Sequence, residues 1–194
     1  QEQNSYPGIT NKILSKYVQK ICVAYDKMER YFPLAKIVVT GNPIRQDILS
    51  YTDKPKSANR LFSINKKNPT ILVIGGSLGA KSINNAIANQ IASFKDNKIN
   101  LIWQTGINFK KGKLIDSLKE NNSGINIVDF IQDMALAYSL ADIVVSRAGA
   151  IAISELCCIG KPVILVPSPN VSENHQYKNA QSLVNKKAAI LVED

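Results

Sequence analysis

From residue 70 to the end of the chain, short apolar runs alternate with longer segments in which apolar residues recur every three or four positions. Short runs without polar alternation are typical of strands buried on both faces, and the longer segments are typical of the helices that cover them. The pattern predicts strands at 71–74, 100–103, 125–130, 142–146, 162–166 and 188–192 and helices at 81–94, 111–120, 134–140, 150–159 and 175–185. We therefore expect an α/β fold with a Rossmann-like parallel sheet, in which every strand-to-helix loop lies at the same edge.

The beginning of the chain has a similar but shorter pattern. It predicts a helix at 9–17, a strand at 20–24, a brief helix at 26–31 and a strand at 36–40. Two strands and two helices are too few to enclose a core of their own. We therefore expect this part to be the end of a second α/β domain whose other strands precede it.

The boundary between the two parts is expected near Pro43. The run Gly41-Asn42-Pro43 interrupts the second strand, because proline cannot continue a strand ladder. A helical turn at 44–49 and a charged stretch with proline and serine at 51–69 follow. The expected organisation is the C-terminal part of one domain at 1–43, a connecting segment at 44–69, and a second domain at 70–194 that is incomplete at its end.

The composition excludes several classes of protein. The chain has 194 residues with 45% hydrophobic content, which is ordinary for a packed globular core. No apolar run is long enough to span a bilayer, and no signal segment follows Gln1, so nothing indicates secretion and the chain can be a piece of a longer protein. The cysteines, Cys22, Cys157 and Cys158, have neither a metal-site spacing nor the even number of a disulfide framework. They indicate reduced thiols in a cytoplasmic protein.

The net charge of +9 raises the question of an anionic partner. Most lysines are scattered, and the densest basic cluster contains Lys54, Lys56, Arg60, Lys66 and Lys67. This cluster lacks interleaved aromatic residues, which argues against nucleic acid as a partner. Attraction to an anionic membrane surface fits the charge better but is not specific.

The glycine-rich turn at 75–79 is the strongest local signal of a ligand site. It follows the first predicted strand of the sheet and opens directly into a helix, so its backbone N–H groups favour an anion such as a diphosphate, with the Ser77 hydroxyl as a further donor. A dinucleotide fingerprint is not met, because Ser77 and Ala80 replace two glycines and the next strand leads into Gln104 instead of an acidic residue. A structural turn without a ligand remains the alternative.

Three further loops at the same predicted edge carry polar or small residues. The loop at 146–150 opens a helix that contains Glu155, whose carboxylate suits either the helix dipole or two vicinal sugar hydroxyls. The loop at 167–174 leads to His175, the chain's one histidine, which is either a sugar contact or a solvated residue at a helix start. The loop at 130–134 could offer backbone groups to a planar base, or Asp133 could be only an N-cap. Together these features fit a nucleoside diphosphate sugar.

A series of short motifs carries a family resemblance. They lie, in this order, at 1–4, 10–12, 41–45, 75–80, 130–134, 146–155 and 175–180. With these motifs the chain resembles the MurG family, bacterial GT-B glycosyltransferases of peptidoglycan synthesis. The resemblance implies inverting, metal-independent and cofactor-free transfer of N-acetylglucosamine from UDP-N-acetylglucosamine (UDP-GlcNAc) to the C4 hydroxyl of lipid I (undecaprenyl-pyrophosphoryl-MurNAc-pentapeptide), giving lipid II.

The resemblance also implies roles for individual residues. Gly76, Ser77 and Gly79 would hold the diphosphate, and Arg45 and the backbone at Ile131 would flank the uridine. Ala150, Ile151 and Ala152 would line the nucleotide, and Glu155 would bind the ribose hydroxyls. His175 and Gln176 would bind the N-acetylglucosamine hydroxyls, and Asn4 would face the cleft. Two positions depart from the family pattern, since Ala152 stands where some members have threonine and His175 where some have glutamine.

No catalytic residue is expected in this chain. The family's glycine-rich N-terminal loop, with its general base, and the apolar patch that seats the enzyme on the cytoplasmic face of the inner membrane have no counterpart in the sequence. We therefore expect the chain to bind the donor and not to turn over. The alternatives are a binding subunit that needs a partner chain, another GT-B enzyme such as a glycolipid synthase or UDP-sugar epimerase, and an NAD oxidoreductase.

Overall fold

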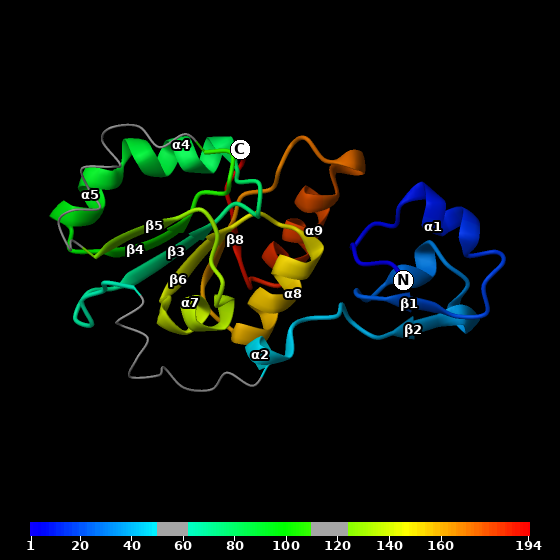
Figure 1. Cartoon of the computed structure of the whole chain (residues 1–194). Coiled ribbons are helices and arrows are strands. Elements are labelled where there is room, and N and C mark those ends of the chain that lie inside the picture. The colour runs from blue at the N-terminus through cyan, green and yellow to red at the C-terminus, as the bar shows by residue number, and fades with distance from the viewer. Residues whose placement is uncertain (50–61, 110–123) are drawn as a thin grey trace.

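The computed structural model describes residues 1–49, 62–109 and 124–194. It contains a small unit at the N-terminus and a larger unit built on a six-stranded parallel sheet (Figure 1). The helix predicted at 111–120 and part of the linker predicted at 51–69 lie outside the described residues.

All strands of the larger sheet are parallel, as predicted. The strand order is β5-β4-β3-β6-β7-β8. The strands are β3 (Thr70–Ile74), β4 (Asn100–Gln104), β5 (Ile125–Val128), β6 (Ile143–Ser146), β7 (Val163–Leu165) and β8 (Ile190–Leu191). From β3 the chain runs outward through β4 to β5 and then returns to β6 on the other side of β3. The carboxyl ends of β3 and β6 therefore form a topological switch point, where ligands of such sheets bind.

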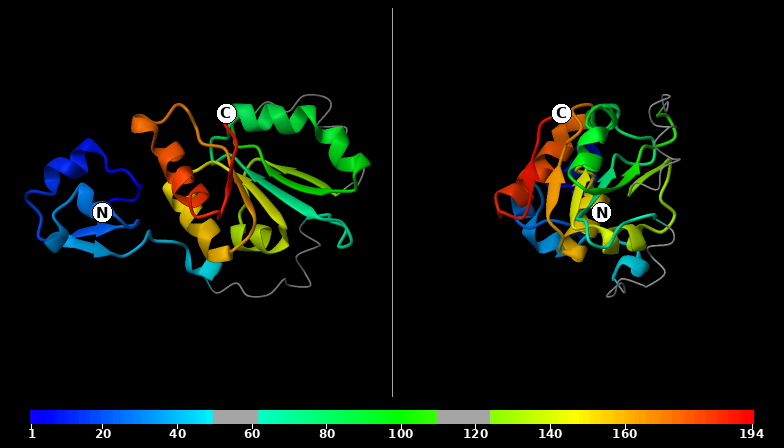
Figure 2. Two further views of the ribbon diagram at one scale, coloured as in Figure 1. Left: turned by 180° about the vertical axis from the view of Figure 1, so that it is seen from behind. Right: turned by 90° about the vertical axis from the view of Figure 1, so that its left-hand side faces the viewer.

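Helices cover both faces of this sheet (Figures 1 and 2). They are α4 (Lys81–Asn89), α5 (Ile91–Asp96), α7 (Met134–Leu140), α8 (Ala150–Ile159) and α9 (His175–Val184). Successive strand residues point to opposite faces: Leu72 packs in the core with α7, α8 and α9, whereas Val73 packs with α4 and α5. This two-sided burial explains why the strands read as unbroken apolar runs.

The predicted helix at 81–94 is wrong in one respect, because the structure has two helices there. The chain leaves helical geometry at Gln90, with φ −108° and ψ 9°, before α5 begins at Ile91. Both helices keep an apolar side against the sheet, through Ile83 in α4 and Ile91 in α5. The apolar spacing therefore gave no sign of the break.

The small N-terminal unit has one parallel strand pair. Its elements are α1 (Ile9–Leu14), β1 (Ile21–Val23), the 3-10 helices η1 (Met28–Arg30) and η2 (Leu34–Lys36), and β2 (Ile37–Val39). The helix predicted at 9–17 ends early, at Leu14, and the one predicted at 26–31 is a single 3-10 turn. The hydrophobic core of this unit is a small cluster that includes Val23, Met28 and Phe32.

The two units are joined by a short segment that packs on the larger one. The predicted helical turn is present as α2 (Gln46–Leu49), whose Ile48 is buried in the core with α7 and α8. Asn42, just before it, donates from Nδ2 to the Ala150 carbonyl oxygen at 3.4 Å and to Ser154 Oγ at 3.1 Å. Asn42 thus contacts the start of α8 directly.

A buried asparagine ties α4 to the end of β4. Asn84 is only 2% exposed, and its Nδ2 donates to the Thr105 carbonyl oxygen at 2.7 Å while its Oδ1 accepts from Trp103 Nε1 at 3.0 Å. Both partners are buried as well. These bonds fix α4 against the strand that lies beside the glycine turn.

The substitution Asn84→Leu is expected to lower the free energy of unfolding by about 2–4 kcal/mol, because two buried groups lose their partners. Urea denaturation measures this loss. Asn85→Leu, at the adjacent exposed position, is the matched control and should change stability by about 0.5 kcal/mol or less. Equal effects of the two substitutions would contradict the assigned role of Asn84.

Tyr25 makes the free energy of unfolding depend on pH in the alkaline range. It lines a cavity of about 500 Å³ between the N-terminal unit and the helices α8 and α9, which contribute Cys157 and Ser182. Burial, with a smaller contribution from Cys157, raises the pKa of Tyr25 from its ordinary value of 10.0 to about 12. The folded chain therefore holds the phenol proton more tightly than the unfolded chain, so stability is lost as pH rises from about 10 to 12.

The substitution Tyr25→Phe removes this titration. Between pH 9 and pH 11 the variant should lose about 1 kcal/mol less unfolding free energy than the parent chain, as measured by urea denaturation at each pH. Tyr17→Phe, at a position that is 81% exposed, is the control and should follow the parent chain. Parallel pH curves for Tyr25→Phe and the parent would exclude a buried phenol at this position.

Candidate functional site

Three helices that follow neighbouring strands begin without a side-chain cap. They are α4 after β3, α8 after β6 and α9 after β7, with N-cap residues Ala80, Gly149 and Asn174. By contrast, Asp133 caps α7 by accepting from the Leu136 amide at 2.8 Å, as one of the two interpretations of the loop at 130–134 proposed. The first N–H groups of an uncapped helix are available to an anion. The switch point therefore has several free donors at one place.

The glycine turn before α4 is held tightly against the end of β4. Gly76 and Gly79 have φ of +88° and +86°, and a Cβ at Gly79 would overlap the Thr105 carbonyl oxygen. The Gly79 amide donates to the Gly76 carbonyl oxygen at 3.1 Å, which closes the turn. Ser77 lies exposed at its tip, as expected. The turn thus places Ser77 beside the uncapped start of α4.

Gln104 links this turn to the next predicted site loop. Its Nε2 donates to the Gly76 carbonyl oxygen at 3.1 Å, and its Oε1 accepts from the Ile131 amide at 2.9 Å. The Ile131 N–H is therefore bonded within the protein, which leaves its carbonyl oxygen for any contact with a base. Sequence reasoning used Gln104 only to exclude a dinucleotide and missed this bridging role.

Glu155 is a buried carboxylate with two partners. It is 7% exposed; Oε1 lies 3.3 Å from Arg45 Nε, and Oε2 accepts from the Tyr138 hydroxyl at 3.1 Å. Burial, followed by the charge of Glu155, raises the pKa of Tyr138, so the phenol stays protonated as a donor. A carboxylate has about four acceptor positions, so two remain for further donors. The carboxylate is thus oriented but not saturated.

The first turn of α8 lies between these groups. Ala150, Ile151 and Ala152 are half-buried. Arg45, which is expected beside a uridine, forms an ion pair with Glu155. Glu155 lies on the same helix as these three residues. The structure therefore places the predicted nucleotide-lining residues and the predicted ribose acceptor within one helix.

The start of α9 combines backbone strain with an unpaired nitrogen. Glu173 and Asn174 both have φ of 54°, a left-handed conformation that is uncommon for residues other than glycine. His175 Nε2 lies 3.6 Å from Glu173 Oε2, and His175 Nδ1 is buried without a hydrogen-bond partner among the described residues. A buried unpaired nitrogen is costly unless a ligand group satisfies it. Gln176 instead accepts from the Ser168 amide at 2.9 Å through Oε1.

Asn4 contacts α9 through a residue to which the sequence analysis gave no role. Asn179 is fully buried; it accepts from the Ser5 amide at 2.8 Å and donates from Nδ2 to Asn4 Oδ1 at 2.9 Å. Asn4 Nδ2 in turn donates to Glu2 Oε1 at 3.3 Å. No signal in the sequence points to this role, because the burial of the Asn179 amide and its partners are seen only in the folded chain.

Arg147 is a second functional candidate that sequence reasoning missed. Its guanidinium donates to the carbonyl oxygens of Val166 at 3.0 Å and Pro167 at 3.2 Å, and to Ser82 Oγ at 3.0 Å. It thereby joins the loop before α9 to the first turn of α4. Its position directly after a buried strand, within a loop of small residues, was the signal.

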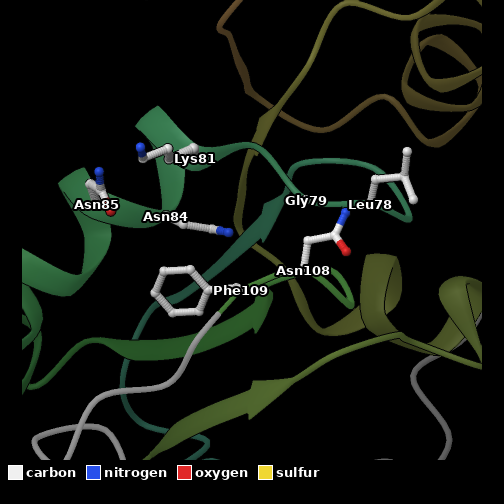
Figure 3. A pocket seen from close by; sticks show the side chains of 7 residues that line it. All are labelled: Leu78, Gly79, Lys81, Asn84, Asn85, Asn108 and Phe109. Carbon is white, nitrogen blue, oxygen red and sulfur yellow. The ribbon is translucent and has the colours of Figure 1, made fainter.

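A pocket of about 520 Å³ opens beside the glycine turn (Figure 3). It is lined by Leu78, Gly79, Lys81, Asn84, Asn85, Asn108 and Phe109. Asn108 lies close to Leu78, and Lys81 projects from the first turn of α4 (Figure 3). Its size is in the range of ligand sites, and it adds a cation near the turn. Within the described ranges, no group of three or more His, Cys, Asp or Glu residues could hold a metal ion.

Curated relatives match the whole length of this chain. A relative from Cytophaga hutchinsonii is 52% identical over 195 residues, and one from Bacteroides fragilis is 51% identical over 197 residues; the matches cover 100% of this chain and 52% of each relative. Both are named UDP-N-acetylglucosamine–N-acetylmuramyl-(pentapeptide) pyrophosphoryl-undecaprenol N-acetylglucosamine transferase. The chain thus spans about half the length of the curated relatives it matches.

Solved structures confirm the predicted fold of GT-B type. The crystal structure of Acinetobacter baumannii MurG matches with a TM-score of 0.74 and 31% identity over 99% of this chain and 52% of that one. The glycosyltransferase of kitacinnamycin matches with a TM-score of 0.66 at 19% identity, over 97% of this chain and 46% of that one, and supports the fold alone. Residues 70–194 match the family model described as the glycosyltransferase family 28 C-terminal domain. The chain therefore belongs to glycosyltransferase family 28.

Proposed function

We propose that this chain is the donor-binding half of an enzyme that transfers N-acetylglucosamine from UDP-GlcNAc to lipid I, giving lipid II for peptidoglycan. The names of relatives about 50% identical over the whole chain support this function. Because the chain spans about half their length, we assign it the donor-binding part only. In this assignment residues 1–43 complete an acceptor-binding domain, 44–69 connect the domains, and 70–194 bind the donor.

The observation that carries the proposal is a group of three uncapped helix starts that follow neighbouring parallel strands, with the buried carboxylate of Glu155 on one of these helices. The N–H groups at the starts of α4 and α8 suit a diphosphate, whose charge the helix dipoles favour. Glu155, with two acceptor positions left, suits the two vicinal hydroxyls of a ribose. A nucleoside diphosphate joins these two groups in one ligand.

The remaining roles follow from this placement. Arg45 and the backbone at Ile131 would flank the uridine, and the first turn of α8, 150–152, would line the nucleotide. His175, through its unpaired Nδ1, would bind a sugar hydroxyl. Gln176 is left with its Nε2 as a donor to the sugar, because Oε1 holds the loop before α9. Asn4 faces the sugar from the other unit.

The chemical step is a displacement at the anomeric carbon. The C4 hydroxyl of the acceptor attacks this carbon, the bond to the UDP oxygen breaks with inversion, and the proton passes to a base outside this chain. Negative charge grows on the diphosphate as the bond breaks. Fixed N–H dipoles at 77–80 and 149–151 stabilise that charge more in the transition state than in the ground state, which lowers the barrier.

We further propose that the enzyme works at the cytoplasmic face of the inner membrane, because its acceptor carries an undecaprenyl chain. In the parts of the chain that the structure describes, no helix is both long and apolar enough to cross a bilayer. Attachment would therefore be peripheral, and the net charge of +9 favours an anionic surface.

Glu155→Gln is expected to weaken UDP-GlcNAc binding by about 10- to 100-fold, because an ionised acceptor to the ribose is lost. Isothermal titration calorimetry of the 194-residue chain measures this change. Asp96→Asn, an exposed acid at the end of α5, removes the same charge and should leave binding unchanged.

Three results would count against the proposal. A folded parent chain without affinity for UDP-GlcNAc would contradict the donor site. Equal affinity in Glu155→Gln and the parent would contradict the ribose assignment. Loss of thermal stability in Glu155→Gln that matches the loss of binding would show a structural role instead.

A further inference from the structure

The first turn of α9 needs support from outside its own helix. It carries His175 and Gln176, yet it begins after two left-handed residues and without a side-chain cap. Such backbone geometry persists only where surrounding contacts over-determine it. The bond from the Ser168 amide to Gln176 supplies one contact, on the side of the preceding loop. The opposite side of the turn faces the N-terminal unit.

On that side, Tyr6 of the N-terminal unit meets α9 with its ring. The Lys178 ammonium lies 3.3 Å from the ring centroid, and the His175 ring stands edge-on to Tyr6 at 6.2 Å and 71°. Residues 175 and 178 are three apart, so they share one side of the helix. One tyrosine ring therefore contacts both the lysine and the histidine at the start of α9.

The Tyr6 ring is itself fixed by its own unit. The Lys12 ammonium lies 4.1 Å from its centroid, and Tyr31 packs against it in a T-shaped arrangement at 5.3 Å and 74°. A hydrogen bond to Tyr6 raises the pKa of Lys12, in agreement with a favourable contact between this ammonium and Tyr6. Contacts within the N-terminal unit therefore set the orientation of the ring that Lys178 contacts.

A second lysine also joins the two units, but its contact is an exposed ion pair, which stabilises less than the contact of Lys178 with Tyr6. Lys186, just beyond α9, pairs with Asp26 at 3.4 Å, but the two side chains are 67% and 64% exposed. Exposed ion pairs of this type contribute little because water screens them. An ammonium over an aromatic face depends less on such screening. Lys178 is therefore the stronger candidate for holding α9.

We propose that Tyr6 and Lys178 are positioning residues that hold the first turn of α9 so that His175 meets the sugar of the donor. This inference rests on the proposed function, because it assigns the sugar to His175. It assigns no contact with the nucleotide to either residue. Loss of the contact should therefore weaken binding of the sugar nucleotide and spare binding of the nucleotide alone.

The first test compares UDP-GlcNAc with UDP by calorimetry. Lys178→Met and Tyr6→Leu should each weaken UDP-GlcNAc binding by about 3- to 10-fold and change UDP binding by less than about twofold. Tyr6→Phe keeps the ring and should retain the affinity of the parent chain. Lys186→Met, the matched lysine of the exposed ion pair, should behave like the parent for both ligands.

Equal weakening of UDP and UDP-GlcNAc by Lys178→Met would overturn the inference, since a general structural effect would explain it. Unchanged binding of both ligands would overturn it as well. If the parent chain bound no uridine nucleotide, both the proposed function and this inference would fail. Binding of UDP without any gain from the sugar would overturn this inference and leave the nucleotide site of the proposed function intact.

A second measurement tests the contact without any donor. The methylene protons next to the Lys178 ammonium should resonate upfield of those of exposed lysines in a carbon–proton NMR spectrum, because they lie over the ring. Tyr6→Leu should move this resonance to the position of the exposed lysines, and Tyr6→Phe should not. A Lys178 resonance at the exposed position in the parent chain would overturn the inference whatever the binding data show.

Discussion

The constraint on which the site depends is that the helix starts at the carboxyl edge of the sheet must stay uncapped. A capping side chain typically contributes about 1 kcal/mol, and α4, α8 and α9 all begin without one. Other side chains hold these starts in place. Gln104 fixes the glycine turn before α4, Asn42 contacts the start of α8, and Arg147 bonds the loop before α9 to α4. Side chains from other parts of the chain thus replace local caps at these helix starts.

Glu155 is likewise held by contacts that leave part of its binding capacity for a ligand. Its carboxylate is buried, so it needs partners, and Arg45 and Tyr138 supply them without using all acceptor positions. In the proposed function these partners orient the carboxylate toward the ribose before the donor arrives. Such preorganisation lowers the cost of ordering the site on binding. The carboxylate lies beyond the first turn of α8, where the effect of the helix dipole is small. Its contacts with Arg45 and Tyr138 therefore matter more for its role than the helix dipole does.

The sheet and the site loops could be predicted from the sequence, because buried strands, glycine turns and amphipathic helices leave local patterns. The two strands of the N-terminal unit and the glycine turn lay where the pattern placed them. The break at Gln90 left no pattern, since both flanking helices keep their apolar side. The roles of Asn84, Gln104 and Asn179 could not be predicted, because each bonds to a partner at least 19 residues away in the chain. Only the folded structure brings such partners together.

In the proposed function, the helix starts at the switch point bind the diphosphate of a uridine nucleotide sugar. The decisive measurement is a crystal structure of this chain with UDP-GlcNAc. We expect the diphosphate against the backbone N–H groups of 77–80 and 149–151, with the ribose hydroxyls on Glu155 and the sugar near His175. A diphosphate bound elsewhere, for example against the Lys12 and Lys178 ammonium groups, would contradict it.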